Sequence, residues 1–173
     1  MEERNDVVTF KGSPMTLVGP GLEVGSKVPE TTLVGVDLAP VSPLEHSAGK
    51  PKIFITVPSV DTSVCSLESK KFSDALQEMG DRAAGYVISA DLPFALKRWC
   101  AAEGVDNLTM LSDYRGMEMA KSWGLYLKEL GLFARAVYVT DADGKIVYEE
   151  IVPEIGSEPD YKAALTALQQ AGS

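Results

Sequence analysis

Residues 52–65 read KIFITVPSVDTSVC and contain, in order, a strand, a turn and the start of a helix. The apolar, partly β-branched run 52–57 is typical of a strand buried at the centre of a parallel sheet. A proline and polar residues follow, and a helical spacing of apolar residues begins near Thr62. Cys65 therefore falls in the first helical turn, where free backbone N–H groups and the positive helix end favour an anion. We expect its thiol to ionise more readily than a free thiol, and the thiolate is the reactive form.

Strands and helices alternate along the rest of the chain. A β-hairpin is predicted at about 7–18, where two β-branched runs flank a Gly-Ser-Pro turn, and the segments 19–31 and 37–50 are expected to be loops. Further strands are expected at 33–36, 86–88, 108–111, 134–140 and 145–152, and helices at 63–79, 91–103, 117–123 and 158–170. This alternation predicts a parallel sheet to which the late hairpin adds antiparallel strands. We expect a single α/β domain over residues 1–173, with a thioredoxin-like fold and an N-terminal β-hairpin extension.

The composition is that of an ordinary globular protein, with 45% apolar and 24% charged residues among 173. A net charge of −9 argues against a nucleic-acid-binding face and against binding to anionic membranes. No apolar run reaches the roughly 18 residues of a membrane span, and the polar N-terminal residues show no signal-peptide pattern. We therefore expect a cytoplasmic location, where thiols stay reduced and disulfides are transient or catalytic. Two cysteines and one histidine, His46, are too few for a Cys/His-rich structural zinc site.

The pattern Pro58-x-x-x-Thr62-x-x-Cys65 resembles the active-site motif of the peroxiredoxins. The full string between Pro58 and Cys65 is similar to the thiol peroxidase branch, the bacterial atypical two-cysteine peroxiredoxins. The other segments similar to that branch are 8–12, 131–136 around Arg135, and 157–161. The resemblance covers nearly the whole chain, and with a second cysteine, Cys100, the combined motifs are highly specific.

The resemblance implies a thiol-dependent peroxidase that reduces hydrogen peroxide and organic hydroperoxides. Cys65 is then the peroxidatic cysteine, whose thiolate attacks a peroxide oxygen and becomes a sulfenic acid. Arg135 would lie beside the sulfur and favour the thiolate, Thr62 would hydrogen-bond the thiolate or the peroxide, and Pro58 would shield the sulfur. Cys100 would be the resolving cysteine and form an intramolecular disulfide, which thioredoxin would reduce. The resemblance implies no metal or cofactor, and a homodimer is expected.

The two cysteines are predicted on different helices, each with its own packing. A disulfide needs Cα atoms roughly 4.4–6.8 Å apart, and we expect the reduced form to hold Cys65 and Cys100 further apart than that. The first turn around Cys65 and part of the Cys100 helix must then unwind in each cycle.

Several of these residues also have simpler interpretations. Cys65 and Cys100 could be core thiols, because free cysteine is among the most buried residue types. Arg135 could face solvent at a sheet edge, and Thr62 could be only a helix N-cap, a role compatible with catalysis. His46 is expected to be an exposed loop residue without a catalytic role.

Two other functions stay open on the sequence alone. A protein thiol–disulfide oxidoreductase would normally carry Cys-x-x-Cys, whereas the residues three positions before and after Cys65 are Thr62 and Glu68. A non-enzymatic redox sensor on a thioredoxin scaffold would be oxidised slowly, without turnover by any reductant.

Overall fold

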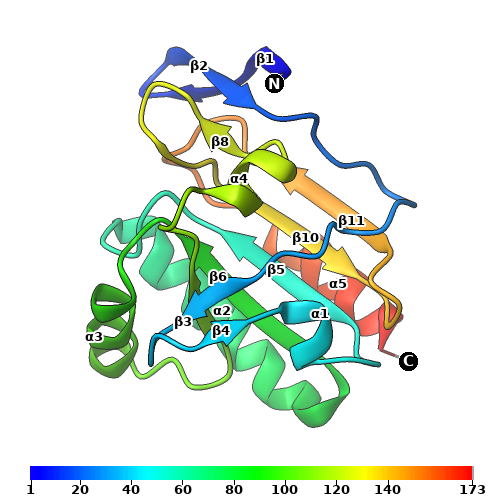
Figure 1. The fold of residues 1–173 in the computed structure, drawn as a ribbon. Helices are drawn as coiled ribbons and strands as arrows, with labels where there is room; N and C mark the ends of the chain where they lie inside the picture. The colour runs from blue at the N-terminus through cyan, green and yellow to red at the C-terminus, as the bar shows by residue number, and fades with distance from the viewer. Residues whose placement is uncertain (173) are drawn as a thin grey trace.

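The computed structural model describes residues 1–172, and Ser173, the last residue of the expected domain, lies outside them. A seven-stranded sheet runs through the centre of the molecule (Figure 1), in the order β11-β10-β5-β6-β7-β3-β4. Its strands are β3 (Leu33–Gly35), β4 (Pro40–Val41), β5 (Lys52–Thr56), β6 (Ala84–Ser89), β7 (Thr109–Ser112), β10 (Ala136–Thr140) and β11 (Ile146–Ile151). The central strands β5, β6 and β7 are parallel, and β10 pairs antiparallel with β5. The mixed sheet predicted from the alternation of elements is confirmed.

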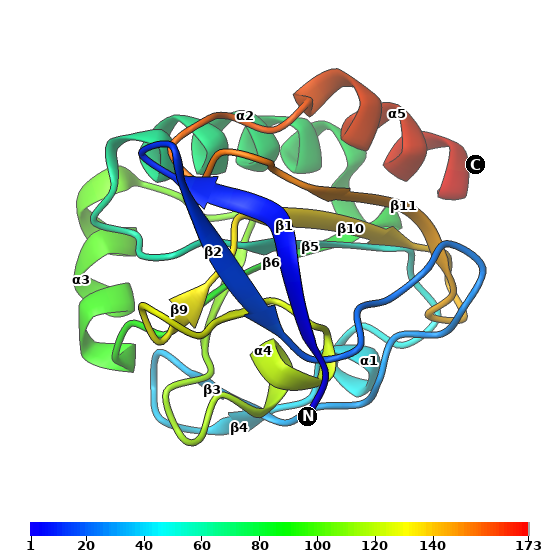
Figure 2. The same ribbon diagram turned by 90° about the horizontal axis from the view of Figure 1, so that it is seen from above.

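Helices cover both faces of this sheet (Figure 2). One face carries α2 (Ser63–Met79) and α5 (Tyr161–Ala171), and the other carries α1 (Pro43–His46) and α4 (Glu118–Ser122). The remaining helix, α3 (Pro93–Glu103), packs beside β7. All five residues of β5 are buried, as expected for a strand covered on both faces. Successive side chains alternate between two cores, so Ile53 and Ile55 pack on the α2 side and Phe54 packs on the other.

The N-terminal hairpin belongs to a second, four-stranded sheet with the order β1-β2-β8-β9. Its strands are β1 (Glu3–Phe10), β2 (Ser13–Val18), β8 (Tyr126–Leu127) and β9 (Leu132–Phe133). The hairpin predicted at about 7–18 is confirmed, and it begins earlier because Glu3 pairs with Val18. The strands β8 and β9 have no counterpart among the predicted elements, since two residues are too few to show a periodicity.

The helix that carries Cys65 begins and ends where the apolar spacing predicts. Thr62 is the N-cap of α2 and Gly80 is its C-cap, with φ 59° in the region that favours glycine. A short 3₁₀ turn, Gly80–Arg82, leads from it into β6. At Gly85 in β6, an added Cβ would collide with leucine side chains, so the strand and α2 are in close contact there.

The segment 37–50 is not wholly a loop, because it contains the short elements β4 and α1. His46 is exposed as expected, but it is the last residue of α1, and its Nδ1 lies 2.8 Å from Tyr86 Oη. Elements of this length depend on tertiary contacts that the local sequence does not reveal. None of the helices in residues 1–172 combines the length and the apolar character that crossing a bilayer requires.

Candidate active site

Cys65 lies at the end of the central sheet at which β5 and β6 finish and β10 begins. Parallel neighbours end at the same edge, so the connection after β5 lies beside the connection after β6. We call residues 57–62, which join β5 to α2, the cysteine loop. Because β10 runs in the opposite direction, Arg135, the residue directly before it, reaches the same edge. The topology therefore gathers segments that are distant in the sequence around one thiol.

The Cys65 side chain is completely buried. Its Sγ lies 3.7 Å from Ser69 Oγ, one turn further along α2. Burial raises the pKa of this thiol to about 12, while the Ser69 hydrogen bond and the charge of Arg135 act to lower it. The expectation that Cys65 ionises more readily than a free thiol is therefore wrong for this closed arrangement. Loss of solvation is the largest influence on this pKa, ahead of the Ser69 hydrogen bond and the charge of Arg135.

Arg135 does not face solvent, because it is only 1% exposed and forms a buried ion pair with Glu68. Its Nη1 lies 2.9 Å from Glu68 Oε2, and its Nε donates to Ile155 O at 2.8 Å. Glu68 is fully buried, and its Oε1 has no hydrogen-bond partner among residues 1–172. Burial raises the pKa of Glu68 to about 7, although the charge of Arg135 acts to lower it. The guanidinium thus has its anionic partner in Glu68 and makes no hydrogen bond to Cys65 within the described part of the chain.

Glu68 is the site residue that the sequence reasoning missed. The sequence alone drew attention to Glu68 only because it occupies the position, three residues after Cys65, where a Cys-x-x-Cys motif would have its second cysteine. Two signals could have identified it. Residues three apart share a helix face, so Glu68 lies on the same buried face as Cys65. A carboxylate on a buried face needs a partner, and Arg135 next to an apolar strand is the matching cation.

Thr62 and Pro58 both belong to the cysteine loop. The Thr62 hydroxyl does not cap α2, because it donates to Ser59 O at 2.9 Å and accepts from Arg135 Nη2 at 3.4 Å. The N-cap interpretation is therefore correct for the backbone of Thr62 and wrong for its side chain. Pro58 is buried in the loop directly after β5. The structure thus places Thr62 and Arg135 in one hydrogen-bonded chain at the start of the Cys65 helix.

Cys100 lies outside this chain of contacts. It is half-buried in α3, where its Sγ donates to Val105 O at 2.9 Å and burial raises the pKa of its thiol. Both cysteines are free thiols. The two helices are nevertheless neighbours, because Glu103 accepts from Ser66 Oγ at 3.4 Å and pairs with Lys70 at 3.3 Å. The thiols therefore lie on adjacent helices, and each has its own hydrogen-bond partner.

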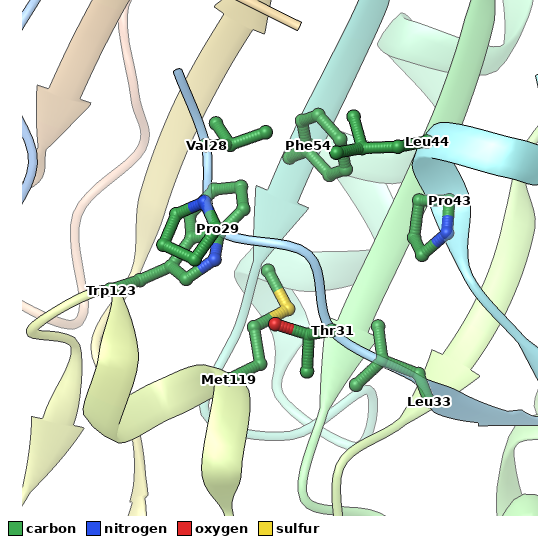
Figure 3. A pocket seen from close by; sticks show the side chains of 9 residues that line it. All are labelled: Val28, Pro29, Thr31, Leu33, Pro43, Leu44, Phe54, Met119 and Trp123. Carbon is green, nitrogen blue, oxygen red and sulfur yellow. The ribbon is translucent and has the colours of Figure 1, made fainter. Parts of the chain in front are cut away.

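An apolar pocket lies elsewhere in the molecule, between α4 and the segment that leads into β3 (Figure 3). Phe54, Met119 and Trp123 contribute to its walls. These side chains belong to the core on the face of the sheet away from Cys65, and none of the residues predicted for the site lines the pocket. Among the described residues, no group of three or more His, Cys, Asp or Glu side chains is arranged to hold a metal ion. The candidate site is therefore the cysteine loop and its surroundings.

Comparison with known proteins identifies first the class of protein to which this chain belongs and then the branch within that class. Residues 23–165 match the Redoxin family model. A thiol peroxidase of Listeria innocua is 46% identical over 164 residues, which cover 95% of this chain and 98% of the relative. A thiol peroxidase of Staphylococcus aureus is 47% identical over 163 residues, covering 94% and 97%. The crystal structure of a peroxiredoxin-like protein from Aquifex aeolicus matches with a TM-score of 0.88 at 36% identity, over 99% of each chain. This chain therefore belongs to the thiol peroxidase family of the peroxiredoxins.

Proposed function

We propose that this thiol peroxidase reduces hydrogen peroxide and organic hydroperoxides at Cys65, forms a disulfide with Cys100, and is recycled by thioredoxin. The observation that carries the proposal is the placement of Cys65 in the first turn of α2, beside the hydrogen-bonded chain of Thr62, Arg135 and Glu68. A buried cation and a hydroxyl next to a thiol can orient a peroxide and stabilise negative charge on its leaving oxygen. Family membership supports the peroxidase chemistry, and the residue roles are our assignment.

Each turn of the proposed cycle transfers two electrons from the thioredoxin dithiol to the peroxide. The Cys65 thiolate attacks one peroxide oxygen, an S–O bond forms as the O–O bond breaks, and the leaving alkoxide or hydroxide takes up a proton. The sulfenic acid then condenses with the Cys100 thiol to give a disulfide and water. The dithiol of thioredoxin reduces this disulfide by thiol–disulfide exchange and is itself oxidised. Arg135 supplies the permanent charge that stabilises the leaving oxygen.

Cys65 must lose a proton before it can attack, and the adjacent ion pair influences this step. Glu68 raises the pKa of Cys65, whereas Arg135 lowers it. Protonation of Glu68 would remove the first effect and leave the charge of Arg135 uncompensated. Glu68 therefore has two roles in the proposal, because it orients the guanidinium and adjusts how strongly that charge acts on the thiol.

Disulfide formation requires both thiols to leave their present partners. Cys65 is buried beside Ser69, and Cys100 donates to a backbone carbonyl of its own segment. We therefore retain the prediction that the first turn of α2 and part of α3 unwind in each cycle. This movement would also break the contacts from Ser66 and Lys70 to Glu103 that join the two helices.

The competing functions receive less support. A protein thiol–disulfide oxidoreductase would need a second thiol near the first, but the position three residues after Cys65 is Glu68, which is paired with Arg135. A redox sensor could also use a resolving cysteine, so catalytic turnover by a reductant is what distinguishes the peroxidase from a sensor. We further propose that residues 1–173 act as one domain, that the chain forms a homodimer, and that it works in the cytoplasm.

Intact-mass measurement under denaturing, non-reducing conditions tests the proposal, after one equivalent of hydroperoxide is added to the reduced protein. Loss of two hydrogens from the monomer is the expected result. A lasting gain of one oxygen would remove Cys100 from the cycle, and a disulfide-linked dimer would place resolution between chains. An unchanged mass would overturn the peroxidase assignment. In the matched variants, Cys100→Ser should keep the added oxygen and Cys65→Ser should keep its mass.

A further inference from the structure

Asp91 connects the cysteine loop to the beginning of the helix that carries Cys100. It lies two residues after the end of β6 and directly before Leu92, the N-cap of α3. Because β5 and β6 are parallel neighbours, the cysteine loop that follows β5 lies next to Asp91. No step of the proposed cycle uses this carboxylate.

Both oxygens of the Asp91 carboxylate accept hydrogen bonds from the cysteine loop. Oδ1 accepts from Ser59 Oγ at 2.8 Å, and Oδ2 accepts from Val60 N at 2.9 Å. Oδ2 also accepts from Ser89 Oγ at 2.7 Å, and Asp91 N donates to the same hydroxyl at 3.2 Å. Ser89 is fully buried at the end of β6. The sheet therefore fixes the carboxylate, and the carboxylate fixes the loop.

The contacts continue from Ser59 to the cation of the site. Ser59 O accepts from Thr62 Oγ1 at 2.9 Å and from Thr62 N at 3.3 Å. Thr62 Oγ1 in turn accepts from Arg135 Nη2 at 3.4 Å. An unbroken chain of contacts thus runs from Asp91 through the loop to the guanidinium whose charge acts on Cys65.

Two simpler explanations do not account for Asp91. It does not cap α3, since the N-cap is Leu92 and the Asp91 carboxylate accepts from the loop instead. Its charge does not assist ionisation of the thiol either, because it raises the pKa of Cys65. The Asp91 carboxylate opposes thiolate formation, yet it makes two hydrogen bonds to the cysteine loop. Its position is explained if it holds that loop in place.

We propose that Asp91 is a positioning residue that holds the cysteine loop in its peroxide-reactive arrangement and delays its opening toward Cys100. The inference rests on the proposed function, because it concerns the balance between two steps of that cycle. While Asp91 holds Ser59 and Val60, Cys65 stays beside Arg135, where it reacts with peroxide. Releasing these contacts favours the open loop that disulfide formation requires.

Asp91→Asn tests this proposal, because it keeps the shape of the side chain and replaces one acceptor oxygen with a donor. Rapid mixing of the reduced full chain with hydrogen peroxide, followed by tryptophan fluorescence, separates a peroxide-dependent step from a peroxide-independent one. We expect the first step to slow and the second to accelerate, each on the order of tenfold, because a hydrogen bond to a charged group is lost. The fraction of Cys65 that gains two oxygens at high peroxide should fall, since the sulfenic acid is resolved sooner.

Two matched variants define the controls. Asp74→Asn removes one negative charge from an exposed position of α2 and should change neither rate. Ser59→Ala removes one contact to Asp91 without changing the charge, and should shift both rates in the same directions as Asp91→Asn. It also replaces Asp91→Asn in the test if that variant does not fold.

Two kinetic outcomes would overturn the proposal. Slowing of both steps with an unchanged ratio would assign Asp91 a purely structural role. A faster peroxide-dependent step would show that its charge acts on the thiol and that holding the loop is unimportant. Hydrogen exchange of residues 57–65 in the reduced protein, without peroxide, separates this proposal from the proposed function. Faster exchange in Asp91→Asn supports the loop-holding role even if the wild type fails to react, and unchanged exchange refutes it.

Discussion

Replacing Glu68 with glutamine should remove a pH dependence of stability that originates in the candidate active site. Glu68 is fully buried, and among the described residues only one of its oxygens is paired, with Arg135 Nη1 at 2.9 Å. Burial raises its pKa from 4.5 to about 7; Arg135 opposes this rise, and the charges of Glu150 and Glu158 add to it. Between about pH 4.5 and pH 7, the folded chain therefore holds a proton at this carboxyl that the unfolded chain has already released.

The sign and the size of the effect follow from this difference. A carboxyl whose folded pKa is raised contributes stability that is fully present below pH 4.5 and is lost as the pH rises through about 7. Each pKa unit corresponds to about 1.4 kcal/mol, so the free energy of unfolding should fall by about 3 kcal/mol across this interval. Glu68→Gln carries no such proton. Its stability relative to the wild type should therefore rise by about 3 kcal/mol between about pH 4.5 and about pH 8.

Denaturant titrations of the reduced wild type and of Glu68→Gln at a series of pH values measure this difference. Glu78→Gln, at an exposed position of the same helix, controls for the loss of one charge. A difference that is flat across the range, or that falls toward alkaline pH, would refute the reasoning. Either result would mean that Glu68 stays ionised and that its attraction to Arg135 outweighs the cost of burial.

Glu68→Gln should also lower the pKa of Cys65, because the charge of Glu68 raises it; alkylation rate against pH measures this, and a rise would contradict the argument. Gly85→Ala would press a methyl group against leucine side chains and should cost about 1–3 kcal/mol in denaturant titrations. Unchanged stability would show that this contact can relax. Thr62→Val removes the hydroxyl that contacts the loop and Arg135, and should slow the peroxide reaction about tenfold, with Thr62→Ser close to wild type.

The elements that local sequence predicts well are long or have marked ends. The helix expected at 63–79 is observed as Ser63–Met79, because its apolar spacing is sustained and Gly80 ends it. The strands β8 and β9 are different, since they exist only through pairing with each other and with β2. Their register depends on residues more than a hundred positions away, such as Leu17 opposite Leu127, and no local pattern records that.

The candidate site likewise has features that the sequence predicts and features that it does not. Motif and topology together predict which residues meet, and the structure brings Thr62 and Arg135 to the start of the Cys65 helix. Motif and topology do not predict which carboxylate pairs with Arg135. That the anionic partner of Arg135 is Glu68, and that burial governs the pKa of Cys65, depends on how completely the surrounding side chains exclude water.

Two carboxylates near Cys65, those of Glu68 and Asp91, both raise the pKa of the thiol. A site arranged only to maximise the thiolate would contain neither of them. Each carboxylate instead positions another group. Glu68 orients Arg135 and, in our proposal, Asp91 holds the cysteine loop. In the proposed cycle Cys65 reacts in a closed site and then leaves it for Cys100, which requires contacts that are firm and also reversible. Charge-assisted hydrogen bonds that weaken on protonation or on loop opening have this property, whereas an apolar lining would not.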